Sequence, residues 1–598
     1  MKARLLPLLC VYSTVALAAA DFYISPAGND GWSGRLAEPN AARSDGPFAT
    51  IARARDAVRS LKRDGLRKDL VVQIREGVYT LTSPLVFKSE DSGTVDHSIT
   101  YAAYPGEHPV ISGGRELRGW KPVQRGRWTL DTAAVPAFRQ LFIDGQRRPR
   151  ARTPNEGFFR IEKSFGDDRK RFQYSGKDIR RWNNLQDVEL VLFYDWEIAR
   201  STLARIEEAA HLVFFAHPVG NLDDPMWGFN RFEVHQRYYL ENALEFIDNP
   251  GEWYRDRHSG LLTYFAMRGG GEDMASARTV AAVTEQLLLV RGTLDKPVRN
   301  LHFSGLRFEY AAFPLPEGGY GGIQAGHYAS RGPQWSILPA AIDLEAAIGC
   351  RIENCRILRT GSSGIGLRRG CRENVIAGNE IADTGGNGIQ IGEPAGEKQD
   401  DAANPNPANP AVIVRGNVVS NNHIHHAGQE YFGAVGIWIG FAQDTLVEHN
   451  LLHDLPYTGI SVGWDWGSRP TPCRGNRIEY NHIHHVLGQL SDGGGIYTLG
   501  WQPGTVLRGN LIHDTDRLHG RADQNGIFFD QGSKGYLVEE NIIFRTPGGG
   551  PIRFNLNEQS WHTFRNNYFG VLPDDPRFPA EKAQSAGCRP CGSVYPVP

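Results

Sequence analysis

The chain has 598 residues, enough for several domains or for one long repeat array. Its 65 lysines and arginines nearly balance 67 aspartates and glutamates, for a net charge of -2, and no long basic or acidic run breaks that balance. This composition argues against a nucleic acid or an anionic membrane as the main partner and favours an uncharged or weakly charged one.

The first twenty residues are typical of a secretory signal peptide. Lys2 and Arg4 precede an apolar run that ends on small residues, in the stretch MKARLLPLLCVYSTVALAAA. This run is shorter than the ~20 apolar residues that a membrane-spanning helix requires, so we expect cleavage and no membrane insertion. We predict a signal peptide over 1–20, a mature chain starting near Asp21, and a secreted or periplasmic location.

Cysteine usage leaves the redox state undecided. Cys10 lies in the signal segment, so six of the seven cysteines belong to the mature chain. An even number is compatible with disulfide bonds outside the cytosol and equally with free thiols. Cys588 and Cys591 form a lone C-x-x-C pair without a second pair or a His at metal-ligand spacing. We predict no metal site and no cofactor.

Residues 21–118 are expected to form an N-terminal cap and the first rungs of a β-solenoid. The stretch PFATIARARDAVRSLKRDG has apolar residues at helical spacing, which predicts an amphipathic helix. Two β-prone stretches follow, DLVVQIREGVYTLTSPLVF and SITYAAYPGEHPVISGG. Because the end of a solenoid exposes unpaired strand edges, we expect the helix to cover that end.

Residues 119–290 lose the rung pattern and are rich in Trp, Tyr and Phe. Alternating stretches such as RQLFIDGQRRPRARTP and LLTYFAM indicate further strands. We therefore predict an inserted β-rich domain over 119–290, after which VRNLHFSGLRFEY resumes the solenoid.

Residues 291–572 carry a repeat whose steps are mostly 26 to 31 residues, and 573–598 form a C-terminal tail. In each unit an Asn precedes an apolar residue by two positions, and a Gly-Ile pair follows. Short β-prone runs at this period predict an all-β fold, a right-handed parallel β-helix; leucine-rich repeats would need regularly spaced leucines. The repeated Asn is expected to form a ladder of turns. Its members are Asn379, Asn422, Asn450, Asn481, Asn510, Asn541 and Asn567.

The repeat becomes irregular where we expect a binding face. Fourteen residues separate the Asn from the Gly-Ile pair in the rung that begins at Asn422, compared with nine in the rung that begins at Asn450. Longer insertions on one side of a repeat array tend to build its binding face. The insertion after Asn422 contains Glu430, and the insertions of two later rungs contain Asp492 and Asp523.

Aromatic side chains gather near these insertions. The stretch GWDWGSRPTPC supplies Trp464 and Asp465, Trp501 lies one rung further on, and Tyr497 belongs to the intervening strand. Aromatic rings beside carboxylates suit carbohydrate, because rings pack on C–H faces while acids bind hydroxyls. A His recurs three residues after the Asn in four consecutive rungs. We expect a stacked ladder there and no metal site, with His484 as a candidate substrate contact.

The chemistry that best fits an exported, nearly neutral chain with paired acids and aromatics is glycosidic bond hydrolysis. It requires one carboxylic acid to protonate the leaving oxygen and one carboxylate to attack the sugar or activate water, about 5 to 10 Å apart. The similar stretches SDGGGIYTLG and ADQNGIFFDQG supply Asp492, Asp523 and Asp530. Taken singly, an Asp in a Gly-rich turn is usually only a turn former.

Together with DFYISPAGNDGWSG, YYLENALEFIDNPGEWYRDRHSGLLTYF and PYTGISVGWDWG, these stretches resemble the right-handed β-helix glycoside hydrolases of family 141 over nearly the whole mature chain. That family is associated with α-L-fucosidase action on complex pectin and with xylanase action. The resemblance implies a hydrolase of plant cell-wall polysaccharide with two catalytic aspartates, which carry over most naturally onto Asp492 and Asp530.

Strand geometry leaves a second catalytic pair open. Asp492 precedes its strand and Asp530 follows the equivalent strand of the next rung, so a straight strand would separate them by roughly 20 Å. Glycines 493–495 are able to fold the segment back. Asp523 shares the slot of Asp492 one rung on, ~5 Å away, and is the alternative catalytic residue.

Two other functions fit a β-helix. A polysaccharide lyase or epimerase needs positive charge or Ca²⁺ beside a uronate, but Arg469 and Lys534 do not form an evident basic cluster. A non-catalytic glycan-binding β-helix would use the acids only as turn residues. A lyase releases an unsaturated product that absorbs ultraviolet light, and a hydrolase does not.

Overall fold

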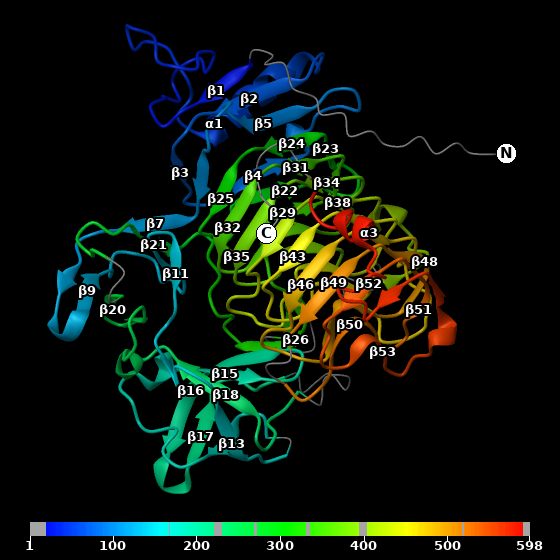
Figure 1. Ribbon diagram of the computed structural model, residues 1–598. Helices are drawn as coiled ribbons and strands as arrows, with labels where there is room; N and C mark the ends of the chain where they lie inside the picture. Colours follow the sequence, from blue (N-terminus) through cyan, green and yellow to red (C-terminus); the bar gives the residue numbers. More distant parts are fainter. Residues whose placement is uncertain are drawn as a thin grey trace.

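The structure is a computed structural model that describes residues 20–166, 168–220, 230–267, 272–329, 335–393, 403–516 and 520–589. Three long parallel sheets wind into a β-helix, with an antiparallel β-rich segment beside it (Figure 1). This confirms the predicted all-β class, the parallel β-helix and the inserted β-rich domain. The expected signal peptide lies outside the described residues except for residue 20. Within the described part of the chain, no helix has the length and apolar character needed to cross a bilayer.

Sheet A contains twelve strands that pair in parallel. Its strands, in spatial order, are β1 (Phe22–Ile24), β2 (Leu70–Ile74), β5 (Ile99–Ala103), β24 (Leu301–Ser304), β31 (Arg351–Glu353), β34 (Val375–Ala377), β38 (Val418–Ser420), β42 (Leu446–Glu448), β45 (Arg477–Glu479), β48 (Trp501–Arg508), β51 (Lys534–Glu539) and β54 (Thr563–Arg565).

Sheet B contains eleven strands and follows sheet A in each rung. Its strands are β3 (Val78–Thr80), β6 (Val110–Ser112), β25 (Arg307–Glu309), β32 (Arg356–Thr360), β35 (Glu380–Thr384), β39 (His423–His425), β43 (Leu451–His453), β46 (His482–Val486), β49 (Leu511–Thr515), β52 (Ile542–Phe544) and β55 (Tyr568–Phe569).

Sheet C contains ten strands and completes each rung. Its strands are β4 (Leu85–Lys88), β22 (Leu288–Arg291), β29 (Ala340–Glu345), β33 (Ser363–Leu367), β36 (Ile389–Ile391), β40 (Ile437–Ile439), β44 (Ile460–Val462), β47 (Gly493–Thr498), β50 (Gln524–Phe529) and β53 (Gly550–Phe554). Short parallel pairs, β23 (Val298–Arg299) with β30 (Ala347–Ile348) and β37 (Val414–Arg415) with β41 (Ala442–Gln443), lie between sheets C and A.

Aliphatic side chains fill the interior in continuous stacks. In sheet B the central residue of each strand points inward and lies directly over its equivalent in the next rung. Full burial of one such side chain contributes about 1.5–3 kcal/mol. The stack consists of Ile357, Ile381, Ile424, Leu452, Ile483, Ile512 and Ile543, all fully buried.

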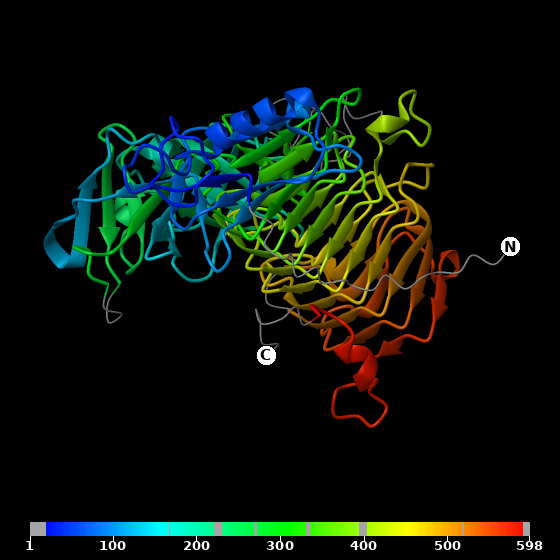
Figure 2. The same cartoon turned by 90° about the horizontal axis from the view of Figure 1, so that it is seen from above.

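An amphipathic helix, α1 (Ile51–Leu61), lies at the N-terminal end of the stack of rungs (Figure 2). The Thr50 side chain accepts the main-chain N–H of Arg53 and so caps the helix. Its buried face, Ile51, Ala54, Ala57 and Val58, joins the main core. The helix expected from the sequence is therefore confirmed.

The inserted segment is built from antiparallel sheets. One is ordered β11-β10-β21-β7, a second β19-β20-β9-β8, and a third contains β12, β13, β14, β15, β16, β17 and β18. Their bounds are β7 (Gly114–Leu117), β8 (Lys121–Pro122), β9 (Arg127–Asp131), β10 (Leu141–Ile143), β11 (Gln146–Arg148), β12 (Arg152–Thr153), β13 (Phe159–Lys163), β14 (Arg171–Tyr174), β15 (Glu189–Phe193), β16 (Ile198–Glu207), β17 (Leu212–Phe215), β18 (Arg237–Glu241), β19 (Trp253–Arg255), β20 (Leu261–Phe265) and β21 (Thr279–Ala282).

The third inserted sheet recruits strands from the later part of the chain. These are β26 (Tyr320–Gln324), β27 (His327–Ala329) and β28 (Trp335–Ile337), and β26 pairs antiparallel with β16. Residues 313–329 and 335–338 therefore leave the β-helix and tie it to the insertion, which the sequence pattern did not reveal.

Short helices complete the described chain. They are η1 (Lys62–Asp64), η2 (Ser89–Asp91), η3 (Gln124–Gly126), η4 (Leu185–Asp187), η5 (Glu208–Ala210), η6 (Leu244–Phe246), η7 (Pro410–Val412), η8 (Gln559–Trp561) and α3 (Ala580–Gln584). After α3 the tail returns along the rungs, where Gly587 donates its N–H to the Tyr480 carbonyl at 2.7 Å and Arg589 donates its N–H to Asn421 Oδ1 at 2.6 Å.

The repeated Asn residues form the expected ladder at the turn between sheets A and B. Asn481 Nδ2 donates to Asn510 Oδ1 at 3.0 Å, and Asn450 donates to Asn481 in the same way at 2.9 Å. Cys355 takes the same slot one rung earlier, where its N–H donates to Asn379 Oδ1 at 2.9 Å. The described cysteines, Cys350, Cys355, Cys371, Cys473 and Cys588, are free thiols.

Histidines stack on the outer face of sheet B, as expected from their spacing. The rings of His453 and His484 lie 4.9 Å apart and nearly parallel, and those of His484 and His513 lie 5.1 Å apart. Burial lowers the pKa of His484 to about 2, because the neutral ring is favoured beside its neighbours. The next rung continues the stack with Phe544.

The Asn ladder generates a stability prediction. We expect Asn481→Ala to lower the free energy of unfolding by about 2–4 kcal/mol, because buried donors and acceptors of the adjacent rungs lose their partners. Chemical denaturation followed by circular dichroism measures the change. Asn249, which is exposed on the insertion, provides the control Asn249→Ala. An unfolding midpoint for Asn481→Ala equal to that of the control would contradict a structural role for the ladder.

Candidate active site

The two acids singled out in the sequence flank adjacent strands of sheet C. β47 and β50 pair in parallel with Gly493 opposite Gln524 and Thr498 opposite Phe529. Asp492 therefore stands at the start of one strand, and Asp530 at the end of the other. Register alone places Asp492 beside Asp523, whose carbonyl accepts the Asp492 N–H at 3.1 Å.

Asp492 has an unusual backbone and a charged partner. Its φ is +58°, a left-handed conformation that changes the direction of the side chain just before β47 begins. Arg553 Nη1 donates to Asp492 Oδ1 at 2.8 Å. Burial raises the pKa of Asp492, Arg553 opposes the rise, and the negative charge of Asp530 adds to it. The two carboxyl groups are thus within electrostatic range of each other.

Asp530 is buried, with both carboxylate oxygens engaged. Tyr497 donates its hydroxyl to Oδ2 at 2.5 Å, and Asn555 Nδ2 donates to Oδ1 at 2.8 Å. Tyr497 lies on β47 and Asn555 directly follows β53, so the rungs on either side hold this one side chain. These two hydrogen bonds fix the orientation of the Asp530 carboxyl group.

A tyrosine and a glutamine connect the acids to the insertion. Tyr457 donates its hydroxyl to the Asp492 carbonyl at 3.0 Å, and Gln324 Nε2 donates to the Tyr457 hydroxyl at 3.2 Å. Gln324 ends β26, one of the strands that extend the inserted sheet. Burial raises the pKa of Tyr457, with further contributions from the charges of Asp492 and Asp530.

The turn between β15 and β16 reaches the same rung from the insertion. The Asp195 carbonyl accepts the N–H of Ser491, next to Asp492, at 2.7 Å. The Asp195 carboxylate pairs with Arg521 at 2.9 Å. Trp196 Nε1 donates to the Ile323 carbonyl at 2.9 Å. The turn is therefore fastened to the rung that carries Asp492, to the following rung and to β26.

Glu197, in the same turn, is a fully buried acid. Ile198 donates its N–H to Glu197 Oε1 at 2.9 Å, and a Cβ at Gly433 would lie 2.2 Å from the carboxyl oxygens. Burial raises the pKa of Glu197 to about 8, although nearby backbone N–H groups oppose the rise. Glu197 therefore carries a proton at neutral pH.

The aromatic residues that the sequence indicated as substrate contacts lie in different surroundings in the structure. Trp464 is buried, and its ring stacks on His327 at 4.0 Å. Its neighbour Trp466 is half-buried and packs against Tyr497. Trp501 begins β48, where it pairs in register with Lys534. Tyr497 thus contacts Asp530, Trp466 packs against the cluster that contains Tyr497, and Trp464 is a core residue.

The remaining acidic candidates occupy different places. Asp465 accepts the N–H of Gly467 at 2.8 Å and pairs with Arg469, which stabilises a turn. Asp523 is exposed, and its carbonyl, not its carboxylate, contacts Asp492.

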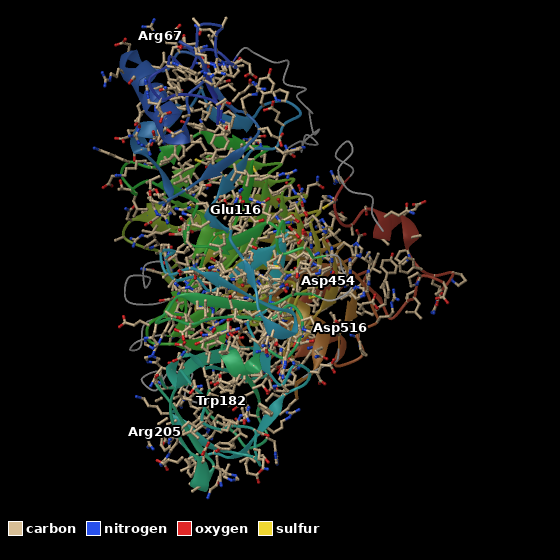
Figure 3. The ribbon with its side chains drawn as sticks, turned by 90° about the vertical axis from the view of Figure 1, so that its left-hand side faces the viewer. Arg67, Glu116, Trp182, Arg205, Asp454 and Asp516 are labelled. Atoms are coloured by element: carbon tan, nitrogen blue, oxygen red, sulfur yellow. The ribbon has the colours of Figure 1, made fainter. Side chains whose placement is uncertain are left out.

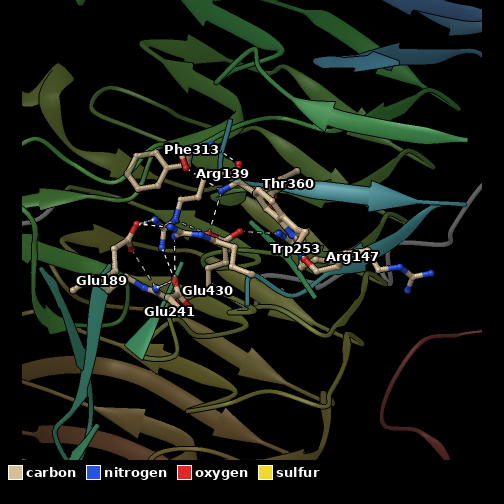
Figure 4. Close-up of polar contacts among 12 residues, drawn as sticks. Arg139, Arg147, Glu189, Glu241, Trp253, Phe313, Thr360 and Glu430 are labelled. Atoms are coloured by element: carbon tan, nitrogen blue, oxygen red, sulfur yellow. Dashed lines mark hydrogen bonds and ion pairs between the residues drawn. The ribbon is translucent and has the colours of Figure 1, made fainter. Parts of the chain in front are cut away.

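Glu430 belongs to a buried ion network between the insertion and the β-helix (Figure 4). Arg139 pairs with Glu189 at 2.6 Å, Glu241 at 3.0 Å and Glu430 at 3.2 Å. Arg147 pairs with the other Glu430 oxygen at 2.8 Å. These contacts place Glu430 in an ion network, and its predicted contact with substrate stays a prediction.

His484 lies in the histidine stack on sheet B, a different face from the acids. Within the described ranges, no three His, Cys, Asp or Glu side chains converge as metal ligands.

Sequence reasoning did not identify Arg553, Asn555, Gln324 or Glu197. Only Arg553 and Asn555 carried a signal, because they lie in the rung that follows Asp530.

The buried Glu197 generates a pH prediction. Its folded pKa lies above the ordinary value of 4.5, so the stability that it contributes is complete below pH 4.5 and is lost as the pH rises to about 8. We expect Glu197→Gln to raise the melting temperature relative to wild type most strongly above pH 8. Thermal unfolding between pH 4.5 and 9 measures this, with exposed Glu207→Gln as control. If the melting temperatures of wild type and Glu197→Gln depend on pH in the same way, the raised pKa of Glu197 is contradicted.

Two family models match the chain. The insertion domain of glycoside hydrolase family 141 matches residues 129–267, and the right-handed β-helix region matches residues 340–543. No curated protein matches the chain.

The chain is similar to several solved structures. A protein described as a glycoside hydrolase is 26% identical, with a TM-score of 0.84 over 95% of this chain and 98% of that chain. XylC with xylose is 15% identical, with a TM-score of 0.45 over 91% of this chain and 69% of that one. A family 136 lacto-N-biosidase from Eubacterium ramulus is 11% identical, with a TM-score of 0.35 over 92% and 68%. The last two scores carry no information on activity. The insertion-domain match and the full-length similarity identify the chain as a glycoside hydrolase-like parallel β-helix enzyme.

Proposed function

We propose that the chain hydrolyses glycosidic bonds of plant cell-wall polysaccharide, with Asp492 and Asp530 as the reacting carboxyl groups. The observation that carries the proposal is their contrasting surroundings. Burial raises the pKa of Asp492, whereas Tyr497 and Asn555 donate hydrogen bonds to both oxygens of Asp530. Glycoside hydrolysis requires two carboxyl groups with different roles, and these two stand in differently built surroundings.

The roles follow from these environments. Asp492 is the general acid: it gives its proton to the glycosidic oxygen as the bond to the anomeric carbon breaks. Asp530 is the carboxylate, which either attacks the anomeric carbon or takes a proton from the attacking water. Tyr497 and Asn555 orient Asp530, and Arg553 holds Asp492 in place.

The substrate class rests on the family resemblance and on the aromatic surroundings. An α-L-fucosidase-like or xylanase-like activity on pectin or xylan fits the resemblance to family 141. Half-buried Trp466 beside Tyr497 supplies a ring for a sugar face. A secreted or periplasmic location, expected from residues 1–20, would bring the enzyme to such polymers.

We expect Asp492→Asn and Asp530→Asn each to lower the rate of sugar release by roughly 10²–10⁴-fold, because each removes one half of the acid–base pair. Mass analysis and ultraviolet absorbance of products from pectin, xylan and fucosylated oligosaccharides measure this. The matched control is Asp523→Asn, on the exposed acid one rung on. An unsaturated product would identify a lyase instead. Activity lost in Asp523→Asn but kept in Asp530→Asn would move the pair to Asp492 and Asp523.

Arg553 sets the pH range in which Asp492 stays protonated. Its positive charge lowers the pKa of Asp492, so Arg553→Met raises that pKa and shifts the alkaline limb of the pH–activity profile to higher pH. The profile of kcat/KM against pH measures this, with exposed Arg565→Met as the control. A shift of the acidic limb alone would show that Asp492 acts as the ionised base and Asp530 as the acid.

A further inference from the structure

A cavity of about 600 Å³ opens within the insertion. It lies between β13, β14, the segment 175–182 and the short helices η5 and η6. Figure 3 shows Trp182, one of its lining residues, on the insertion and apart from the rung residues Asp454 and Asp516. Cavities of roughly 300–1,000 Å³ are the usual size of small-molecule sites.

β16 separates this cavity from the two aspartates. It begins at Ile198, beside the turn that contacts Ser491, and ends at Glu207, next to the cavity residue Glu208. Its ten extended residues cover roughly 33 Å. A mono- or disaccharide bound in the cavity therefore does not reach the two aspartates, whereas one polymer chain is able to contact the cavity and the aspartates together.

Aromatic rings form part of the cavity wall. Trp182 meets Phe246 edge-on with centroids 5.0 Å apart. The exposed ring of His211 stacks on Tyr174 at 5.3 Å, with only 8° between the planes. Trp182, Phe246 and Tyr174 are buried in the core of the insertion, so His211 is the ring of this group whose face is open to a sugar.

Acidic groups dominate the polar part of the wall. Asp178 is half-buried, and its carboxylate makes no hydrogen bond or ion pair to a side chain within the described ranges. Because acids outnumber cations, the wall disfavours an anionic uronate polymer and offers acceptors to neutral hydroxyls. The charged lining residues are Asp178, Glu208, Glu245 and Asp248 against Lys177 and Arg180.

We propose that this cavity is a second glycan-binding site, which holds a neutral polysaccharide while the aspartates cleave another part of the same polymer. The statement that the aspartates cleave the polymer rests on the proposed function. The statement that the cavity binds glycan rests on the cavity alone. Contact at both places raises the effective substrate concentration at the aspartates without new contacts there.

Binding is tested apart from catalysis in an Asp530→Asn background. Affinity electrophoresis compares soluble arabinoxylan, a neutral polymer, with polygalacturonate, an anionic one. We expect arabinoxylan to retard the protein, and Asp178→Asn to weaken that retardation about 5-fold or more. Glu207→Gln, on an exposed neighbour outside the cavity, should leave it unchanged. Melting temperatures establish that each variant is folded, and Asp178→Asn retains nearly the same side-chain volume.

In otherwise wild-type enzyme, Asp178→Asn should raise KM for polymer at unchanged kcat and leave cleavage of a short oligosaccharide unaltered. Equal retardation of Asp178→Asn and its parent, or preferential retardation by polygalacturonate, would overturn the site. If wild type cleaves no glycan but its retardation by arabinoxylan depends on Asp178, the catalytic proposal fails and the binding site stands.

Discussion

Register between neighbouring rungs is the constraint on which this structure depends. Each strand pairs in parallel with its equivalent one rung away, so the inward aliphatic residues and the turn asparagines fall directly over one another. A shift by one residue would turn the aliphatic stack toward solvent and break the Asn ladder together. The register continues from rung to rung in the central part of sheet B, whereas β48 and β51 of sheet A contain a shift between Trp501 and Thr505.

A regular β-helix has no enclosed site on its surface, and here the insertion packs against one side of the β-helix. The turn at 194–197 contacts the rung of Asp492, and β26 carries Gln324 toward Tyr457. Between these contacts and the rod lies the Arg139 network, whose charges are buried and therefore need complete pairing. Loss of one partner there would leave an uncompensated charge and loosen the insertion from the acids.

The features that arise from the repeat could be predicted from the sequence. The rungs, the Asn ladder, the histidine stack and the N-terminal helix follow from spacing, because equivalent residues in a solenoid have equivalent neighbours. The surroundings of Trp464 and Glu430 did not follow, since both depend on how segments distant in sequence pack on the rod. Glu197 carries no sequence signal at all: its burial results from the docking of a turn whose position depends on the fold of the whole insertion.

Asp492 and Asp523 show how unequal functions arise from equivalent positions. Both precede strands of sheet C and stand side by side in register, yet Asp523 is exposed whereas Asp492 is covered by the inserted turn and paired with Arg553. Burial then raises the pKa of Asp492, because its charged form loses water that Arg553 only partly replaces. The rung repeat supplies the acids, and the contacts of the inserted turn give them different surroundings.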